Sequence, residues 1–492
     1  MQTLQAETPQ TSENTFLFCL KPNIQPLEIT KRDGELTVNI EELNNLFRSH
    51  QVKDIEPWIK HATEMDRDGD IYLNRIYRVY LNEERSIPIE QTIASIHDVS
   101  FTLYAENEYL RKPLYTPNDP SLNSQCSIPA VKADIAWDYW NIPDEMPGDE
   151  NVLLASVDTG VDYTHPDLLE NIWVNQGEIP EFIFEIGVDT NDDGIISSLE
   201  ISNFMSTQSD LNEDGENNLR DALFSGSPFF DGSDNDNNGY TDDIIGWDAS
   251  GTSGTADNDP LPKTGVNNDS GWAHGTHVAG ILSATTDNEL GMASSVFNGK
   301  ILSVKCSQDG PDTDDPSIHN GYDGMLYAAK AGFSSGLRTI INNSWGSSNY
   351  SSSEQATINI IYNTYNAIIL AAAGNGTENP NNEDYAAHYP ASYDNVVSVC
   401  ALKCTGSWGG WATYHPTIDL AAPGDNIYST VLSESLYWNM NENSPIYKTW
   451  DGSSMASPNA ASVMALVWSY HNAMAKEEII DLVQLTADSS IY

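Results

Sequence analysis

The sequence predicts a protein of the α/β class, whose main part is an open, doubly wound parallel sheet preceded by a small N-terminal α/β domain. From Asn151 onward, short apolar segments alternate with amphipathic segments of helical spacing. Glycine-rich turns follow the apolar segments, as expected for buried parallel strands. The chain has 492 residues, which is enough for two or three domains and at least one large core.

The first part of the chain is expected to contain a tail, residues 1–23, and the small α/β domain, residues 24–115. Residues 112–125 are rich in Pro, Asn and Ser, a composition typical of a linker. The main domain is therefore expected to cover residues 116–492. Helical spacing or strand-like alternation predicts the elements of the small domain at residues 39–50, 75–81, 88–96 and 99–110.

The main domain supplies strands and helices in alternation. Such alternation predicts parallel strands joined by helices that cover both faces of the sheet. Ligands of such sheets bind beyond the carboxyl ends of the strands. The expected strands lie in residues 151–160, 299–306, 338–346, 366–376 and 395–403. The expected helices lie in residues 274–285, 321–332, 354–366, 457–470 and 475–485.

The composition limits the possible partners. The formal net charge is −50, from 72 acidic and 22 basic residues, so nucleic acids and anionic membrane surfaces are not expected to bind. Four or five bound Ca²⁺ ions would cancel only about +8 to +10 of this charge, so most acids are expected on a solvated surface. The first 20 residues lack a signal-peptide pattern, so the protein either stays inside the cell or has lost a secretion signal.

The five cysteines are Cys19, Cys126, Cys306, Cys400 and Cys404. Their number is odd, and their spacing is not that of a metal site. We therefore expect buried, unpaired thiols.

Four polar residues stand where strands end or helices begin. Asp158 ends a strand, His274 opens a helix, Asn375 follows another strand and Ser454 opens the helix after the small-residue stretch DGSSMASP. Attack by a hydroxyl on a carbonyl needs a base, an acid that orients the base, and donors for the developing oxyanion. These four residues provide one group of each kind.

The motifs around these residues resemble those of the subtilisin-like serine peptidases. VDTGVDYTHPDL, HGTHVAGI, AAAGN and GSSMASP occur in the family's order, although this chain has Ser453 where the family usually has Thr. The resemblance implies that Asp158 orients the base, His274 is the base and Ser454 is the nucleophile. Asn375 and the backbone N–H of Ser454 would bind the oxyanion. The implied activity is that of a serine endopeptidase acting through an acyl-enzyme.

The resemblance also implies the substrate contacts. The two segments expected to line the main specificity pocket have backbone that would pair with an extended polypeptide substrate. Trp345 stands where the family often has Leu, which could reshape the pocket. The segments consist of Ser344, Trp345 and Gly346, and of Ala372, Ala373 and Gly374.

Each assignment has an alternative. Asp158 could be a turn former at the end of its strand and nothing more. Asn375 could be a left-handed turn residue, and Ser453 could be a helix-start residue beside the nucleophile. His274 and His277 share a helix face and could bind zinc as a pair, but no third ligand is evident, so His277 is expected to pack as a structural residue. The alternative function is a non-catalytic, calcium-dependent binding or structural protein built on the same fold.

An acidic insertion at about residues 175–260 separates Asp158 from His274 and contains EF-hand-like loops. Carboxylate, amide and carbonyl oxygens at alternate positions can surround one Ca²⁺ ion, and a glycine permits the sharp turn. The first loop offers Asp189, Asn191, Asp193, Ile195 (by its carbonyl) and Glu200; the second offers Asp210, Asn212, Asp214, Glu216 and Asp221; the third offers Asp234, Asp236, Asn238, Tyr240 (by its carbonyl), and Asp242 or Asp243. The calcium is expected to be structural.

Two further regions contain possible metal ligands. Residues 64–75 carry Asp66, Asp68 and Asp70, but Arg75 stands where the closing acid should be, so a turn without metal is expected. By resemblance, Asp167 and Gln125 match ligands of a calcium site found in many of these enzymes, although the loop around 287–290 differs in length.

The domain at 24–115 resembles the family's inhibitory propeptide, chiefly through IYRVYL and SFTLYAENEYL. The resemblance implies a zymogen that removes this domain by cutting itself within residues 105–120. The propeptide would act as an intramolecular inhibitor and folding template. The resemblance further implies a secreted enzyme.

Overall fold

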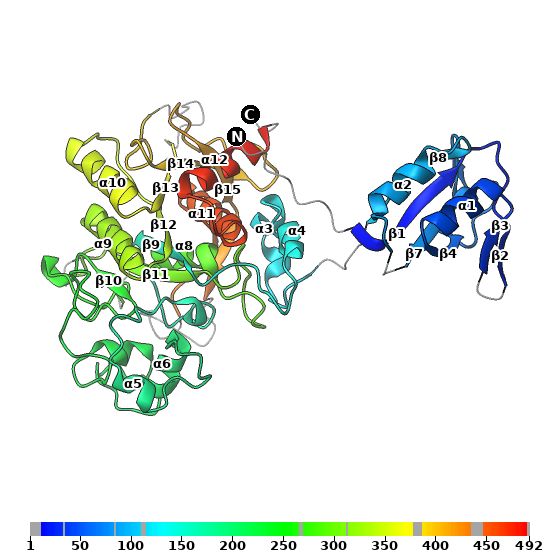
Figure 1. Cartoon of the computed structure of the whole chain (residues 1–492). Helices are drawn as coiled ribbons and strands as arrows, with labels where there is room; N and C mark the ends of the chain where they lie inside the picture. The colour runs from blue at the N-terminus through cyan, green and yellow to red at the C-terminus, as the bar shows by residue number, and fades with distance from the viewer. Residues whose placement is uncertain are drawn as a thin grey trace. The chain divides into compact units, whose positions relative to one another are not determined.

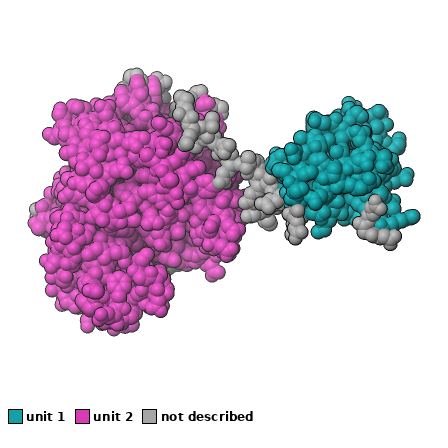
Figure 2. Space-filling view, in the orientation of Figure 1, with its two compact units in different colours: residues 1–113 teal, residues 114–492 magenta. Residues whose placement is uncertain are grey.

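The computed structural model describes residues 11–32, 35–82, 85–109, 115–264, 269–310, 313–376, 386–433 and 446–489. The chain divides into two compact units, Met1–Pro113 and Leu114–Tyr492 (Figures 1 and 2). Each unit is described separately. No helix of the described ranges is long and apolar enough to cross a membrane.

The first unit contains a four-stranded antiparallel sheet in the order β4-β7-β1-β8. Two helices pack their apolar residues on one face, where the sheet contributes Phe16 and Phe18. The strands are β1 (Thr11–Leu20), β4 (Val52–Pro57), β7 (Ile76–Leu81) and β8 (Thr102–Tyr109), and the helices are α1 (Glu41–Ser49) and α2 (Ile89–His97). Two hairpins complete the unit, β2 (Ile29–Arg32) with β3 (Glu35–Val38) and β5 (Arg67–Asp68) with β6 (Ile71–Tyr72).

The start of this unit differs from the prediction. Residues 1–23 were expected to form a tail outside the domain, but β1 lies between β7 and β8 in the sheet. Its side chains alternate between the two faces, so Phe16 and Phe18 enter one core and Leu17 and Cys19 another. The unit therefore begins before residue 24. Residues 1–10 lie outside the described residues.

The second unit contains a seven-stranded, wholly parallel sheet in the order β10-β11-β9-β12-β13-β14-β15. The predicted open parallel sheet is confirmed. The strands are β9 (Val152–Asp158), β10 (Gly246–Asp248), β11 (Lys300–Lys305), β12 (Arg338–Asn343), β13 (Ile368–Ala372), β14 (Val397–Lys403) and β15 (Leu420–Asp425).

Helices cover both faces of this sheet. The central strand β9 sends Leu154 to the face covered by α8 (His274–Ser283) and α11 (Ser453–Tyr470). It sends Leu153 to the face covered by α9 (Gly321–Ser334) and α10 (Ser352–Thr364). Both faces of the strand are buried, which explains its mostly apolar sequence.

Shorter elements surround this framework. The hairpin of β16 (Ile427–Thr430) and β17 (Tyr447–Trp450) leads into α11, and α12 (Lys476–Thr486) follows it. The remaining helices are α3 (Ser127–Ala130), α4 (Ala133–Ala136), α5 (Phe182–Glu185), α6 (Ser198–Met205) and α7 (Asp269–Trp272). The 3₁₀ helices span Leu73–Arg75, Leu122–Ser124, Trp137–Tyr139, Leu169–Asn171, Leu219–Leu223 and Thr252–Gly254.

The insertion forms part of the second unit. Its helices α5 and α6 lie together at one end of the unit (Figure 1). Ile183, Ile201 and Leu219 are buried there in one apolar cluster with residues that flank β9 and α8. This apolar cluster packs the acidic insertion against the segments next to β9 and α8.

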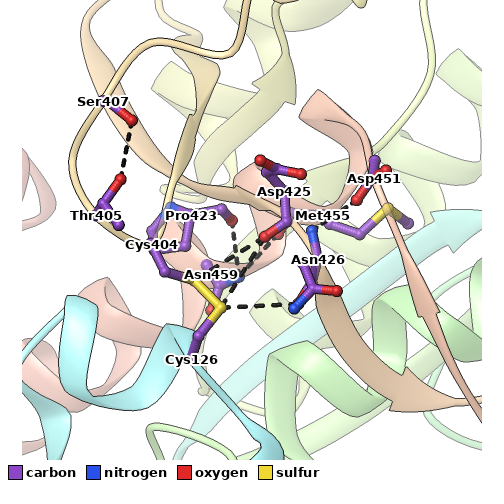
Figure 3. Close-up of a disulfide and its surroundings, with 10 residues drawn as sticks. All are labelled: Cys126, Cys404, Thr405, Ser407, Pro423, Asp425, Asn426, Asp451, Met455 and Asn459. Carbon is purple, nitrogen blue, oxygen red and sulfur yellow. Dashed lines mark hydrogen bonds between the residues drawn. A yellow bond between two sulfur atoms is a disulfide. The ribbon is translucent and has the colours of Figure 1, made fainter.

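The expectation of buried, unpaired thiols is wrong for two of the five cysteines. Cys126 and Cys404 form a disulfide between residues 278 positions apart (Figure 3). The bridge lies beside Asn459 of α11, whose Nδ2 donates to the carbonyl of Pro423 at 3.0 Å. Partners so distant in sequence cannot be paired from cysteine spacing alone. Cys19, Cys306 and Cys400 are buried thiols.

Candidate active site

Asp158 and His274 meet at the carboxyl end of β9. Asp158 is the last residue of the strand, and His274 is the first of α8. His274 Nδ1 lies 2.8 Å from Asp158 Oδ1, which also accepts from the backbone N–H of Thr159 at 2.7 Å. The Asp158 side chain is 1% exposed and that of His274 is 27% exposed. The acid is therefore enclosed, and the imidazole is partly open to solvent.

A glycine permits this approach of helix to strand. A Cβ atom on Gly275 would lie 2.3 Å from the carbonyl oxygen of Gly160 and 3.0 Å from Asp158 Cβ. Any larger residue would push α8 away from the end of β9. Gly275 N–H also donates to Thr159 Oγ1 at 3.1 Å, which fixes the first turn of the helix.

The Asp158 carboxylate affects the pKa of His274. Burial favours the neutral imidazole and lowers its pKa, but the charge of Asp158 and the hydrogen bond to it outweigh burial. The pKa of His274 therefore lies above its ordinary value. Because the carboxylate only accepts, this hydrogen bond places a proton on Nδ1 and leaves Nε2 of the neutral ring as an acceptor.

Ser454 is the second residue of α11, at the positive end of a long helix. Its Oγ donates to the carbonyl oxygen of Ser344 at 3.0 Å, and Ser344 Oγ donates to the carbonyl of Ser454 at 2.8 Å. Among the described residues, no hydrogen bond joins Ser454 to His274. The structure thus brings Asp158 and His274 together and bonds Ser454 to the segment after β12.

Asn375 is held by Ser453. Its Oδ1 accepts from the backbone N–H of Ser453 at 2.7 Å and from Ser453 Oγ at 2.9 Å, which leaves Nδ2 as its donor. A Cβ atom built on Gly452 would lie 3.6 Å from Asn375 Nδ2 and 3.5 Å from the backbone N of Ser454. Asn375 Nδ2 and the backbone N–H of Ser454 are therefore two nitrogen donors close to the same position beside Gly452. Asn375 does not have a positive φ, so it is not a left-handed turn residue.

The two histidines of α8 have different partners. His277 Nε2 lies 3.1 Å from the carbonyl oxygen of Lys448, and its ring stacks on Trp450 with centroids 4.4 Å apart. Burial lowers the pKa of His277 to about 3. His274 Nδ1 is bound to Asp158, whereas the ring of His277 is fully buried against Trp450, as expected of a packed structural residue.

The two predicted substrate segments leave neighbouring strands. Ser344–Gly346 follows β12 and Ala373–Gly374 follows β13, and these strands pair in parallel. The indole N–H of Trp345 donates to the carbonyl oxygen of Val157 at 2.8 Å, and its ring packs edge-on against Tyr322. The indole is therefore fastened to the sheet and to α9.

The three acidic loops share one hydrogen-bond pattern. In each loop, the backbone N–H of the sixth residue donates to the side chain of the first residue. The N–H of the fifth residue donates to the side chain of the third, and the N–H of the seventh to the side chain of the fifth, all at 2.8 to 3.0 Å. The donor–acceptor pairs are Gly194–Asp189, Asp193–Asn191, Ile195–Asp193; Gly215–Asp210, Asp214–Asn212, Glu216–Asp214; Gly239–Asp234, Asn238–Asp236, Tyr240–Asn238. The fourth and sixth residues of each loop have a positive φ.

The twelfth residue closes the first two loops. Glu200 accepts from the backbone N–H groups of Thr190 and Ser197, the second and ninth residues, at 2.7 and 3.0 Å. Asp221 accepts from the corresponding residues of the second loop at 2.7 and 2.9 Å. In both loops the first acid keeps one buried oxygen, Oδ1 of Asp189 and Oδ1 of Asp210, without a partner among the described residues. Donor sets of this kind fit a hard cation such as Ca²⁺.

The third loop ends differently. Asp242 accepts from the backbone N–H groups of Asp231 and Gly232, so its carboxylate caps a turn. Asp243 is fully buried and lies with Asp236 and Glu178 in a group whose ligand atoms are within 4.8 Å of one another. Burial, with repulsion among these acids, raises the pKa of Asp243 to about 8 and that of Glu178 to about 7. Sequence reasoning missed Glu178, because no motif surrounds it.

Asp167 and Gln125, the two residues that resemble ligands of a further calcium site, both bind the loop at 287–293. Both atoms of the Gln125 amide are bonded to the backbone of Ala293. Asp167 accepts from Asn288 Nδ2 and from the backbone N–H of Met292, both at 2.9 Å. Each side chain therefore braces the loop at 287–293. Residues 67–72 form the hairpin β5–β6.

Comparisons with known proteins agree with this architecture. The model of the subtilase family matches residues 149–491. The chain is 26% identical over 402 residues to the thermophilic serine proteinase of Bacillus sp. (strain AK1), covering 81% of this chain and 71% of that protein. It is 29% identical over 406 residues to the extracellular basic protease of Dichelobacter nodosus, covering 79% of this chain and 53% of that protein.

A solved structure shows the same fold. It is that of a protease from Pseudoalteromonas arctica PAMC 21717, with a TM-score of 0.50 and 23% sequence identity, covering 77% of this chain and 94% of that one. The family match spans the parallel sheet and every residue of the site at the ends of its strands. The chain therefore belongs to the subtilase family and is a subtilisin-like serine endopeptidase.

Proposed function

We propose that this endopeptidase works through Asp158, His274 and Ser454. The observation that carries the proposal is the 2.8 Å contact between His274 Nδ1 and the enclosed carboxylate of Asp158, which leaves Nε2 free to accept a proton. In the reaction, Ser454 turns its hydroxyl from the carbonyl of Ser344 to Nε2 of His274. Its oxygen then attacks the carbonyl carbon of the scissile peptide bond.

In this mechanism His274 carries the proton, and two N–H donors stabilise the negative charge of the oxyanion. His274 takes the proton of Ser454 and gives it to the leaving amine, so the C–N bond breaks and an acyl-enzyme remains. Water then attacks the ester, with His274 again as base, and Ser454 regains its proton. Asn375 Nδ2 and the backbone N–H of Ser454 stabilise the oxyanion in both halves of the reaction.

The substrates of this reaction are polypeptides. Ser344–Gly346 and Ala372–Gly374 leave adjacent parallel strands beside Ser454, and their backbone would bind an extended peptide as an added strand. Trp345 contributes backbone to this surface, because its indole is bonded to the carbonyl of Val157.

Labelling with a fluorophosphonate tests the nucleophile. We expect one covalent adduct on the peptide that contains residues 453 and 454, because only an activated serine reacts rapidly with this probe. Ser454→Ala should abolish labelling, whereas Ser457→Ala serves as a control on the same helix. Ser457 Oγ donates to Asn342 Oδ1 and is buried, so it is not expected to react. Undiminished labelling of Ser454→Ala would refute the proposed nucleophile.

The insertion supplies structural calcium sites. The side chains of the three loops fit Ca²⁺ by their oxygen donors, their shared hydrogen-bond pattern and the buried oxygens of Asp189 and Asp210 that lack partners in the described chain. When bound, the cation would neutralise clustered carboxylates and join the two ends of each loop. Serine-based hydrolysis itself needs no metal.

The first unit is an inhibitory propeptide that the enzyme removes. The division of the chain between Pro113 and Leu114 falls within the expected cleavage region, 105–120, of which residues 110–114 lie outside the described residues. The disulfide supports a secreted protein, since such bonds persist in oxidising compartments. The relative from Dichelobacter nodosus is named an extracellular protease.

A further inference from the structure

The third acidic loop lacks its own closing residue. Counting from Asp234, the twelfth position is Ile245, which is apolar and fully buried. At the ninth position, the backbone of Asp242 bonds to Ser233 and its carboxylate caps the turn at 231–232, so the chain leaves the loop there. The first seven residues nevertheless have the hydrogen-bond pattern of the other two loops.

Glu178 occupies the place of the missing acid. Its Oε1 accepts from the backbone N–H of Asn235, the second residue of the loop, at 2.8 Å. This is the bond that Thr190 makes to Glu200 and Leu211 makes to Asp221, each at 2.7 Å. A residue 56 positions before the loop therefore makes the contact that the twelfth residue makes in the other loops.

The second carboxylate oxygen of Glu178 indicates a cation-binding site. Glu178 is 1% exposed, and its Oε2 is buried without a hydrogen-bond partner among the described residues. The carboxylate lies in the group formed with Asp236 and Asp243. Burial and mutual repulsion raise the pKa of Glu178, as expected for acids gathered without a compensating positive charge. A cation among them would remove this repulsion.

The surrounding turn is built to hold Glu178 against the loop. Asn175 Nδ2 donates to Asp236 Oδ2 at 3.2 Å and to Asp243 Oδ1 at 3.1 Å, while its backbone N–H donates to the carbonyl of Ile244. A Cβ atom on Gly177 would lie 2.6 Å from Asp236 Cβ, so only glycine allows this approach. The 175–178 turn and the loop are thus interlocked on both sides of the group.

We propose that Glu178 closes the third loop and that the two segments together bind one Ca²⁺ ion. The donors would come from Glu178, Asp234, Asp236, Asn238, Asp243 and the carbonyl of Tyr240. The inference rests on the proposed calcium role of the insertion and assigns a ligand outside every sequence motif. Such a site would join the segment after β9 to the segment before β10.

Terbium luminescence and calcium stoichiometry test the assignment in full-length Ser454→Ala protein, in which self-cleavage is removed. Tyr240 is the seventh residue of its loop, where the other loops have Ile195 and Glu216, so excitation of tyrosine reports mainly on Tb³⁺ in the third loop. Glu178→Gln should abolish most of this emission and lower the affinity of one calcium site at least about tenfold, because affinity follows the charge of the ligands.

Three further variants make the comparison specific. Glu181→Gln removes an exposed acid three residues away and should bind like the parent. Glu178→Asp should keep the site at reduced affinity, since Asp221 closes the second loop. Glu200→Gln should lower the calcium stoichiometry without loss of tyrosine-sensitised emission. Circular dichroism checks that each variant is folded.

The outcomes separate the two claims. If the parent binds several Ca²⁺ ions and Glu178→Gln shows the same stoichiometry, affinity and emission, the assignment of Glu178 is refuted and the calcium role of the insertion stands. A parent that binds no Ca²⁺ refutes the calcium role itself. If Glu178→Gln does not fold, an unchanged affinity in folded Glu178→Asp counts against the assignment and a weakened one supports it.

Discussion

In the proposed mechanism, Asp158 determines the pH at which His274 can act as a base. The proposed base is the neutral form of His274, whose pKa lies above the ordinary value of about 6.5 because of Asp158. Activity is therefore expected to be present above this raised pKa and to be lost as the pH falls through it. The measurement is kcat/KM between pH 5 and pH 9.

Asp158→Asn should lower kcat by about 10⁴-fold, since the asparagine neither fixes the tautomer nor stabilises the imidazolium. The inflection of the pH profile should also move to lower pH, because burial alone then sets the pKa of His274. Glu145→Gln, at an exposed position, provides the control. An inflection that stays in place in Asp158→Asn would contradict this role of the carboxylate.

At this scale the sequence predicts much of the site. Asp158, His274, Asn375 and Ser454 lie in short motifs, because each chemical role requires a particular backbone next to the functional side chain. Glu178 could not be found in this way, since its contact with the third loop depends on how segments 56 residues apart fold together. The same reason hides the pairing of Cys126 with Cys404.

Among the structural elements, α6 links an acidic loop to the core of the insertion. Glu200 closes the first loop and also forms a capping box with Ser197 at the start of the helix. Ile201 and Met205, on the same helix, are fully buried in the insertion core. Calcium at this loop would therefore stabilise both the helix start and its packing.

A chelator should accordingly lower the melting temperature of the enzyme. A single site at a calcium concentration 100 times its Kd contributes about 2.7 kcal/mol to the free energy of unfolding. The chelator should lower the melting temperature of Glu200→Gln less than that of the parent. It should lower the melting temperature of Glu185→Gln, a change at an exposed position of α5, as much as that of the parent. Calorimetry of the Ser454→Ala background measures the effect. Equal decreases in parent and Glu200→Gln would exclude the first loop as a site.

The sequence predicts the central strands better than the edge strands. β9, β11, β12, β13 and β14 are buried along most of their length, and each contains at least two adjacent apolar residues. β10 has three residues, and β15 contains Pro423 and Gly424, which an edge strand tolerates because one side of its backbone needs no partner strand. β1 was missed because its first five residues are polar.

For the whole molecule, the two units predict a self-processing zymogen. Freshly purified wild-type protein is expected to break within residues 105–120 on standing, whereas Ser454→Ala should remain one chain, because the cut requires the enzyme's own nucleophile. Intact-mass spectrometry over time locates the cut. Ser457→Ala, on the same helix, should be processed like the wild type. Equal persistence of wild-type and Ser454→Ala chains would refute self-processing.

The bond between Cys126 and Cys404 encloses most of the peptidase unit in a covalent ring. In the chain-entropy view, closing a ring of this size destabilises the unfolded state by about 5.6 kcal/mol. A second effect concerns damage: an enzyme that digests proteins also meets its own copies, and its surface loops are exposed to nicking. A single backbone cleavage between the two cysteines leaves both fragments joined by the disulfide, so the cleaved molecule can stay assembled and active.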